Sequence, residues 1–293
     1  NINPESITDC AIENSTLHMK NTTNYAGLLC GQCTSTNLKN VKVSGNLTFE
    51  NTDFIYGGGL AGALSAVYIL DNCESNCSTS IENCEFYNLG GFIGYVKLFD
   101  NLVDGKTATY TRNISQGNIT VNNSDIYAEY MFGGTIGGFI GFANHDHAYN
   151  GFEYTGFESC SSLVNIEVNN LNLHLSTRYA ACNIAGFIGL TYADEPSPIE
   201  MYYKEIYFKD CSYQGNITLT QLNSNVPESM TSYIVGGLFG GHYYNICMNC
   251  SAQGNYTCDF ETGSAYVGGF SGTSCEGESC SLIKSKSPKS IYP

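Results

Sequence analysis

Apolar and polar residues alternate in short stretches along this chain, and several of these stretches are similar to one another. The segment "CSYQGNIT" at residues 211–218 recurs, with changes, as "CSAQGNYT" at 250–257, "NISQGNIT" at 113–120 and "VKVSGNLT" at 41–48. Alternation with a period of two predicts β-strands that bury one face, whereas the periodicity of an amphipathic helix is absent almost everywhere. The pattern therefore predicts an all-β protein.

Five copies of this segment align, beginning at residues 41, 113, 160, 211 and 250. Two mostly apolar columns result: Leu47, Ile119, Ile166, Ile217 and Tyr256 form the first, and Phe49, Val121, Val168, Leu219 and Cys258 form the second. A glycine turn precedes the columns in four copies, whereas Val164 replaces the glycine in the third. Shared columns predict that each copy stacks on the next with these side chains inward.

A second recurring phrase is a glycine-rich block, of which "GGFIG" is typical. The second glycine of each block is at residues 27, 59, 91, 138, 186, 237 and 269. The intervals are 32, 32, 47, 48, 51 and 32 residues, so the unit is near 32 residues and three units carry insertions. We expect these glycines at corners, where a positive φ or a close backbone approach is needed.

Short strands, glycine corners and a fixed period predict a right-handed β-solenoid, or β-helix, with about seven glycine-rich repeats and loop insertions. The repeats account for residues 25–280. Residues 1–24 are expected to form an N-terminal segment or cap, and residues 281–293 an extended basic tail. A β-sandwich is the alternative fold, although it would not need the same phrase at the same corner.

Composition narrows the classes of partner. The 293 residues include 27 acidic and 12 basic ones, which gives a net charge of −15. Such a chain repels phosphate backbones, so we expect no nucleic-acid partner. No apolar run approaches the roughly 20 residues that cross a bilayer, so we expect no membrane span. The chain begins "NINPES", without Met, and we interpret it as processed, with any signal peptide removed.

Fourteen cysteines indicate an oxidising compartment, because cytosolic proteins rarely carry so many outside metal sites. We predict that most are in disulfides. The cysteines are Cys10, Cys30, Cys33, Cys73, Cys77, Cys84, Cys160, Cys182, Cys211, Cys247, Cys250, Cys258, Cys275 and Cys280. Zinc is the alternative, since "CGQC" at residues 30–33 and "CMNC" at 247–250 can build a four-thiolate site.

The pairing of the cysteines is left open by the sequence. Cys160, Cys211 and Cys250 share one column, and stacked strands are close enough for a disulfide between neighbours. Close pairs compete with this arrangement, namely Cys73 with Cys77 and Cys275 with Cys280.

Ten Asn-x-Ser/Thr sequons indicate N-glycosylation. The repeat favours Asn46, Asn118, Asn216 and Asn255, because their flanking apolar residues point inward, and Asn165 shares their column without a sequon. The other expected sites are Asn14, Asn21, Asn113 and Asn122, whereas Asn76 and Asn249 rank lower because the middle residue of each sequon is a Cys. Alternatively, Asn and Thr simply suit an outer face beside a turn.

The segment "VGGLFGGHYYNICMNCSAQGNYT" at residues 235–257 joins the glycine block, a hydrophobic-x-Asn-Cys-Ser step, an Ala and a final Gly-x-x-Thr. It resembles the GLUG repeat family, named for its Gly-Leu-any-Gly core, and the resemblance covers roughly residues 27–272. It implies a solenoid that forms the stalk or contact surface of a large secreted or surface-anchored protein, often an adhesin, without shared catalytic residues. The many cysteines and long insertions depart from the family and look more like a secreted protein of a microbial eukaryote.

Few residues suggest metal chemistry. In "NHDHAYN" at residues 144–150, His145 and His147 reach one ion if the segment is extended, but two adjacent ligands are not a site, and a polar insertion loop is the alternative. Asp100 and Asp104 faintly resemble a calcium loop, without the EF-hand spacing. We predict no metal site and no cofactor.

Catalysis by a β-helix polysaccharide lyase or hydrolase needs clustered carboxylates, or calcium with a basic residue. Arg112 and Arg178 are the only arginines, and acidic residues are not expected to recur at one position of the repeat. The 22 Tyr and 15 Phe residues suggest sugar-stacking platforms at residues 200–208 and 242–245, although stacks along a sheet are the commoner use. We predict that the protein is not an enzyme and has no catalytic residues.

These observations predict a secreted or cell-surface, glycosylated, structural or adhesive solenoid, with a head-to-tail filament or coat as one form. Its expected partners are other copies of itself, or glycans and proteins of a surface or matrix. A carbohydrate-binding or polysaccharide-active β-helix is the alternative. Such a protein should have clustered acids or exposed aromatic residues on one face, whereas a structural rod should have neither.

Overall fold

The computed structural model describes residues 5–21, 24–67, 69–98, 109–128, 134–145, 156–175, 181–193, 206–225, 231–242, 245–273 and 281–283. Every regular element in these ranges is a β-strand, which confirms the all-β prediction. A helix long and apolar enough to cross a membrane is not found in this part of the chain.

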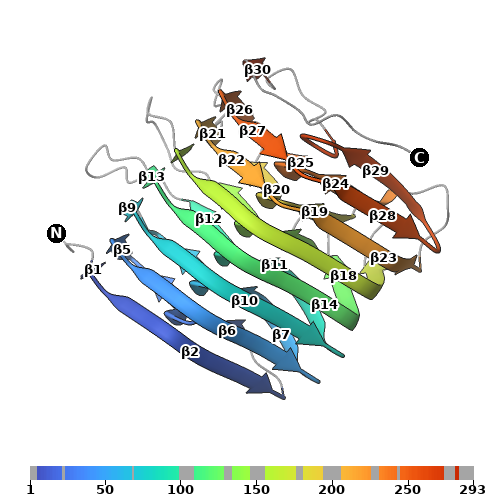
Figure 1. The fold of residues 1–293 in the computed structure, drawn as a ribbon, viewed down its shortest axis with the longest axis horizontal. Helices are drawn as coiled ribbons and strands as arrows, with labels where there is room; N and C mark the ends of the chain where they lie inside the picture. Colours follow the sequence, from blue (N-terminus) through green and yellow to red (C-terminus); the bar gives the residue numbers. More distant parts are fainter. Residues whose placement is uncertain are drawn as a thin grey trace, which may run out of the picture.

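The strands form three sheets (Figure 1), and the strand pairs of the described residues are parallel, as in β1 with β5 and β10 with β14. The first sheet has eight strands: β1 (Glu5–Thr8), β5 (Thr36–Lys39), β9 (Ile69–Asp71), β13 (Thr109–Thr111), β17 (Gly156–Glu158), β21 (Ile206–Lys209), β26 (Asn245–Met248) and β30 (Ser281–Ile283). The third sheet has six: β4 (Cys30–Thr34), β8 (Ala61–Ser65), β12 (Ile93–Leu98), β16 (Ile140–His145), β20 (Ile188–Ala193) and β25 (Phe239–His242).

The second sheet has sixteen strands and two parts. Its longer strands are β2 (Ala11–Lys20), β6 (Lys42–Glu50), β10 (Glu74–Glu82), β14 (Ile114–Ala128) and β18 (Ser161–Leu175), followed by the shorter pairs β22 (Ser212–Gln214) with β23 (Ile217–Ser224) and β27 (Ser251–Gln253) with β28 (Tyr256–Phe260). The other part contains β3 (Tyr25–Ala26), β7 (Asp53–Gly58), β11 (Glu85–Gly90), β15 (Thr135–Gly137), β19 (Cys182–Ala185), β24 (Thr231–Gly236) and β29 (Ser264–Gly268).

The chain visits the three sheets in turn and then returns to the first. Strands β5, β6, β7 and β8 are followed by β9, β10, β11 and β12, and each of the second four pairs with its counterpart in the first four. We call one such round a layer; the seven layers begin at β1, β5, β9, β13, β17, β21 and β26. This topology is compatible with a solenoid, and it lacks the antiparallel pairing of a β-sandwich among the described strands.

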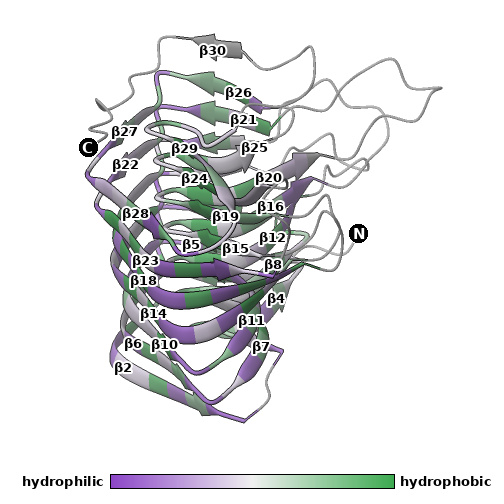
Figure 2. Cartoon of the chain, turned by 90° about the vertical axis from the view of Figure 1, so that its right-hand side faces the viewer, coloured by the Kyte–Doolittle hydropathy of each residue, from purple (hydrophilic) through white to green (hydrophobic). Residues whose placement is uncertain are grey.

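The aligned columns of the sequence are columns of the structure. Ile119 pairs with Ile166, and Ile166 pairs with Ile217, and all three side chains are buried. Hydrophobic and hydrophilic residues alternate along these strands (Figure 2). Thr79 occupies the same column in the third layer, which the alignment of repeated segments did not include.

Both ends of the described chain take part in the sheets. Strands β1 and β2 pair with β5 and β6, with one irregularity between Ile12 and Ser15. From Glu5 to Lys20, the N-terminal segment expected at residues 1–24 therefore forms the first two strands of the first layer. Strand β30 pairs with β26, so the first three residues of the expected tail continue the first sheet, while residues 284–293 lie outside the described ranges.

Two kinds of residue make the corners. The block glycines are needed for close approach, because a Cβ on Gly91 would overlap the carbonyl oxygen of Gly138, which lies in the next layer. Positive φ is supplied mainly by other residues, and the corner before each long strand of the second sheet has Asp9, Asn40, Asn72, Arg112, Ser159, Asp210 and Asn249 in this conformation. Asn and Asp tolerate it better than most side chains.

Aromatic rings stack inside the layers. Phe139 lies between Phe92 and Phe187, with ring centroids 4.8 Å apart on both sides and interplanar angles of 7° and 4°. All three side chains are fully buried. Because the register repeats, a favourable position for one ring is a favourable position for the next.

We predict that Phe139→Ala lowers the free energy of unfolding by about 3–5 kcal/mol, because it leaves a cavity between two fixed rings. Denaturant unfolding followed by circular dichroism measures the change. Leu163→Ala is the matched control, since Leu163 is 42% exposed, and it should change stability by less than about 0.5 kcal/mol. Equal effects of the two variants would contradict the stacked core.

Candidate functional site

An acidic column runs along the outer face of the second sheet. Glu85 on β11 pairs with Asp53 on β7 and with Asp125 on β14, and Asp125 pairs with Asn172 on β18. The side chains of Asp53 and Glu85 are exposed, and that of Asp125 is partly exposed. Side chains in neighbouring parallel strands are about 4.8 Å apart, so three carboxylates occupy successive layers.

An aromatic column lies beside the acidic one, two residues further along each strand. Tyr127 stacks on His174 at a centroid distance of 4.9 Å, and Tyr87 contacts Tyr127 at 5.9 Å with an interplanar angle of 31°. In the layer before Tyr87, the register puts Ile55 in this column. We call the residues Asp53, Glu85, Asp125, Tyr87, Tyr127 and His174 the acid–tyrosine face.

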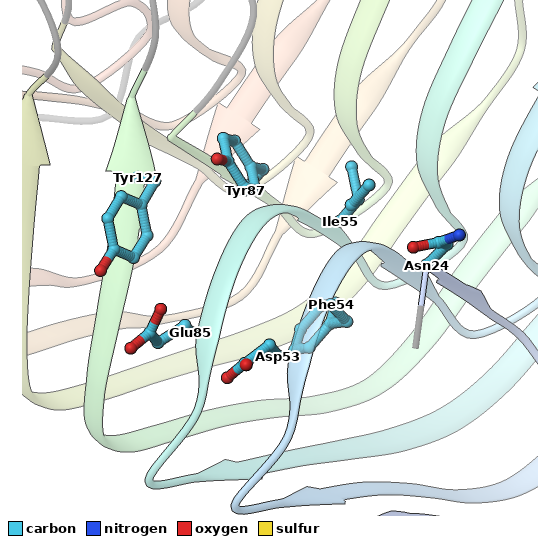
Figure 3. Close-up of a pocket in the computed structure, with 7 residues that line it drawn as sticks. All are labelled: Asn24, Asp53, Phe54, Ile55, Glu85, Tyr87 and Tyr127. Atoms are coloured by element: carbon cyan, nitrogen blue, oxygen red, sulfur yellow. The ribbon is translucent and has the colours of Figure 1, made fainter. Parts of the chain in front are cut away.

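Neighbouring polar groups contact the carboxylates of this face. Asn172 Nδ2 donates a 2.9 Å hydrogen bond to Asp125 Oδ1, and His174 Nε2 lies 3.2 Å from the same oxygen. Tyr127 points its hydroxyl toward Glu85 (Figure 3), and burial, followed by the Glu85 carboxylate, raises the pKa of this tyrosine. Tyr127 therefore stays protonated at neutral pH, with its hydroxyl directed at the Glu85 carboxylate.

A pocket of about 220 Å³ opens where the ring column ends (Figure 3). Its lining residues are Asn24, Asp53, Phe54, Ile55, Glu85, Tyr87 and Tyr127. Tyr87 contacts Tyr127 on one side, and the register puts Ile55 in the same column in the layer before it. The pocket thus combines an aromatic ring, two carboxylates and an amide, which suits a small hydroxylated or cationic group.

Contrary to the expectation from the sequence, one acidic position recurs from layer to layer. Asp53, Glu85, Asp125 and Asn172 are 32, 40 and 47 residues apart, and these unequal intervals conceal the column. A signal was nevertheless present in the tripeptides Asp-Phe-Ile, Glu-Phe-Tyr, Asp-Ile-Tyr and Asn-Leu-His, which begin at these four positions. Each places a polar oxygen, an inward apolar residue and an outward aromatic or aliphatic residue in the same order.

The four favoured sequons share an exposed column, as the repeat predicted. Asn46, Asn118, Asn216 and Asn255 are all exposed, and Asn165 lies between Asn118 and Asn216. Their amides form a ladder: Asn165 Nδ2 donates to Asn118 Oδ1 at 3.2 Å, Asn216 N to Asn165 Oδ1 at 3.0 Å, and Asn255 N to Asn216 Oδ1 at 3.2 Å. The backbone bonds of this ladder use Oδ1 of Asn165 and Asn216 as the acceptor. A glycan is attached to Nδ2, so these bonds are compatible with glycosylation.

The remaining sequons differ in exposure. Asn14 and Asn21 are exposed, as are the lower-ranked Asn76 and Asn249, and Asn122 is half-buried. Asn113 is fully buried: its Nδ2 donates to the Leu70 carbonyl at 2.8 Å, and its Oδ1 accepts from Cys73 N at 2.9 Å. The expectation of a glycan on Asn113 is therefore wrong for this fold, because the amide has no route to solvent.

The cysteines are mostly unpaired in this structure. Cys30 and Cys33 form a disulfide with a Cα separation of 6.4 Å. The other described cysteines are free thiols: Cys10, Cys73, Cys77, Cys84, Cys160, Cys182, Cys211, Cys247, Cys250 and Cys258. Burial raises the pKa of both Cys73 and Cys77 to about 11, so neither is a reactive thiolate at neutral pH. Cys275 and Cys280 lie outside the described residues.

The metal candidates of the sequence are mostly outside the described ranges. Asp100, Asp104 and His147 are among the residues not described, and His145 is buried at the end of β16. Within the described residues, no three His, Cys, Asp or Glu side chains are grouped as a metal site. Of the proposed aromatic platforms, residues 201–205 and 243–244 are also outside the described ranges.

Comparison with known proteins gives no relative for this chain: no family model matches it, and neither a curated protein nor a solved structure is similar to it. The resemblance to GLUG repeats therefore stays a prediction from the quoted motif.

We predict that Glu85→Gln lowers the pKa of Tyr127, because the substitution removes a carboxylate that favours the protonated phenol. Burial remains, so the pKa should stay above that of an exposed tyrosine. Titration of 13C-labelled tyrosine by NMR, with Tyr127→Phe to assign the signal, measures the shift. Glu261→Gln is the control and should leave the signal unchanged; an unchanged or higher pKa in Glu85→Gln would contradict the contact.

Proposed function

We propose that the protein is a right-handed β-solenoid that acts outside the cell as a rigid, glycosylated structural or adhesive rod. The observation that carries the proposal is the in-register stacking of seven layers, which repeats outward-facing side chains at fixed spacing. The resemblance to GLUG repeats supports the same role. A stack of this kind presents a long surface without needing a catalytic centre.

Glycans fit the exposed asparagine column. Asn46 and Asn118 are two layers apart, so each has room for a glycan, whereas Asn216 and Asn255 are in adjacent layers at a spacing of about 4.8 Å. Two glycans at that spacing would crowd each other. We therefore infer that one rod carries a glycan on Asn216 or on Asn255 more often than on both.

Carbohydrate binding is a second candidate function, and the pocket beside Tyr87 favours it. An aromatic ring together with carboxylate and amide oxygens is suited to the apolar face and the hydroxyl groups of a sugar. The acidic column and the net charge of −15 disfavour uronic or sulfated glycans, so neutral or amino sugars are the expected class. Among the described residues that line the pocket there is no lysine, arginine or histidine, which argues against a lyase.

The first and last layers support self-association of the rod. Leu17 and Met19 in the first layer, and Tyr256 and Phe260 in the seventh, are only partly buried and belong to the core columns. A second copy stacked end to end would continue these columns. We therefore include a head-to-tail filament in the proposed function. Another segment of a longer chain is an alternative cover for these edges.

For the glycans, we predict occupancy at Asn46 and Asn118, one occupied site more often than two at Asn216 and Asn255, and none at Asn113. Enzymatic deglycosylation in 18O-labelled water, followed by mass spectrometry of the secreted protein, marks each occupied Asn. Asn165 is the control, since it shares the exposed column and has no sequon. A glycan on Asn113, or none in the exposed column, would contradict the proposal.

For the pocket, we predict that Tyr87→Ala weakens binding of a neutral or amino sugar by about tenfold, which corresponds to about 1.4 kcal/mol. A glycan array finds the ligand, and calorimetry measures the affinity. Tyr266→Ala is the control, because Tyr266 is 55% exposed and lies on β29 in the seventh layer, four layers from Tyr87. Equal loss in both variants would refute the site, and release of shortened sugars would show an enzyme instead.

A further inference from the structure

Three buried cysteines stack at one corner of successive layers. Cys160, Cys211 and Cys250 each directly precede a strand of the second sheet, and the residues after them pair in register, Ser161 with Ser212 and Ser212 with Ser251. Ser212 N donates to the Cys160 carbonyl at 3.0 Å, and Ser251 N to the Cys211 carbonyl at 3.0 Å. The three backbones are therefore one strand spacing apart, about 4.8 Å.

The three side chains also point the same way. Cys160 Sγ donates to the Tyr110 carbonyl at 3.3 Å, Cys211 Sγ to the Phe157 carbonyl at 3.4 Å, and Cys250 Sγ to the Phe208 carbonyl at 3.5 Å, in each case in the preceding layer. None of the three thiols is more than 1% exposed. Burial raises the pKa of Cys211, and the neighbouring thiols of Cys160 and Cys250 raise it further.

A fourth cysteine extends the series, and an asparagine ends it. Cys247, on β26, is also buried, and it pairs with Phe208, whose carbonyl accepts the hydrogen bond from Cys250 Sγ. At the other end, Asn113 takes the next position in the column, with its Nδ2 3.7 Å from Cys160 Sγ. The described thiol contacts thus run in one line, from Cys160 through Cys211 and Cys250 to Cys247.

We infer that this line of thiols is a modification site that matures into two disulfides, Cys160–Cys211 and Cys247–Cys250. In a line of four, this is the one pairing of neighbours that uses every cysteine, whereas a central Cys211–Cys250 bond leaves both ends unpaired. Disulfides accept Cα separations of about 4.4–6.8 Å, which includes the strand spacing. The Cys247-x-x-Cys250 spacing is also that of Cys30 and Cys33, which are already bonded.

Each bond forms by thiol–disulfide exchange with a small disulfide oxidant. Two thiols lose two electrons and two protons to become one disulfide, and the oxidant becomes two thiols. In cells this rests on the proposed extracellular role, because an oxidising compartment must supply the oxidant. Since all four thiols are buried, we expect the bonds to form while the chain folds.

The test is disulfide mapping of the full chain, refolded from the reduced state in reduced and oxidised glutathione. Free thiols are then alkylated, and the protein is digested with trypsin and with cyanogen bromide, which cuts after Met248 between Cys247 and Cys250. We expect one peptide pair linked through Cys160 and Cys211, and another linked through Cys247 and Cys250. A Cys211–Cys250 link, or four alkylated cysteines, would overturn the inference.

Two variants sharpen the result. Cys160→Ser should produce one additional alkylated cysteine in the group, whereas Cys182→Ser should leave both links intact, because Cys182 is a buried thiol whose pKa is raised by burial alone. Loss of both links in Cys182→Ser would contradict the assignment. Mapping the disulfides of the protein from its natural source separates the pairing from the extracellular role. If the cysteines of the native protein are reduced while the refolded protein has the expected links, the extracellular role is refuted and the pairing stands.

Discussion

The parallel, in-register hydrogen bonding of one layer on the next is the constraint on which the rest of this structure depends. Because side chains alternate with a period of two, a fixed register makes each column a stack of similar neighbours. Inside, this gives the Phe92, Phe139 and Phe187 stack and the line of thiols. Outside, it gives the asparagine ladder and the acid–tyrosine face, where each neighbouring carboxylate pair repels by roughly 1 kcal/mol in water.

Repetition decided how much of this the sequence could predict. The columns through Ile166 and Val168 were recovered because their segments are alike, and the all-β class followed from them. Strands β1 and β2 were not predicted because the irregularity between Ile12 and Ser15 breaks the repeated segment in the first layer. The acid–tyrosine face was not predicted because insertions separate its members unequally. The positive-φ corners were attributed to glycine, since a short polar side chain that adopts this conformation leaves no pattern of hydrophobicity.

For Asn113 the sequence held two conflicting signals, a sequon and a position in a buried column, and the prediction of a glycan followed the sequon. The alignment placed Asn113 in the same column as Cys160, Cys211 and Cys250, and that column is buried. Its sequon suggested the surface, but register is set by the whole layer and a sequon by three residues. For proteins of this kind, column membership should therefore outweigh a local motif. The same reasoning separates the exposed Asn118 from the buried Asn113 within one repeated segment.

Distances along one exposed column test the in-register stacking most directly. The column runs from Thr16 in the first layer to Asn165, Asn216 and Asn255 in the fifth, sixth and seventh layers. Spin labels attached through a ketone-bearing unnatural amino acid avoid the native cysteines, and pulsed electron paramagnetic resonance gives the separations. In-register layers predict separations of about 19, 24 and 29 Å, rising by about 4.8 Å per layer. The steps should be equal although the sequence intervals, 51 and 39 residues, are not. Distances that follow the sequence intervals, or that do not rise from layer to layer, would contradict the stacked, in-register structure.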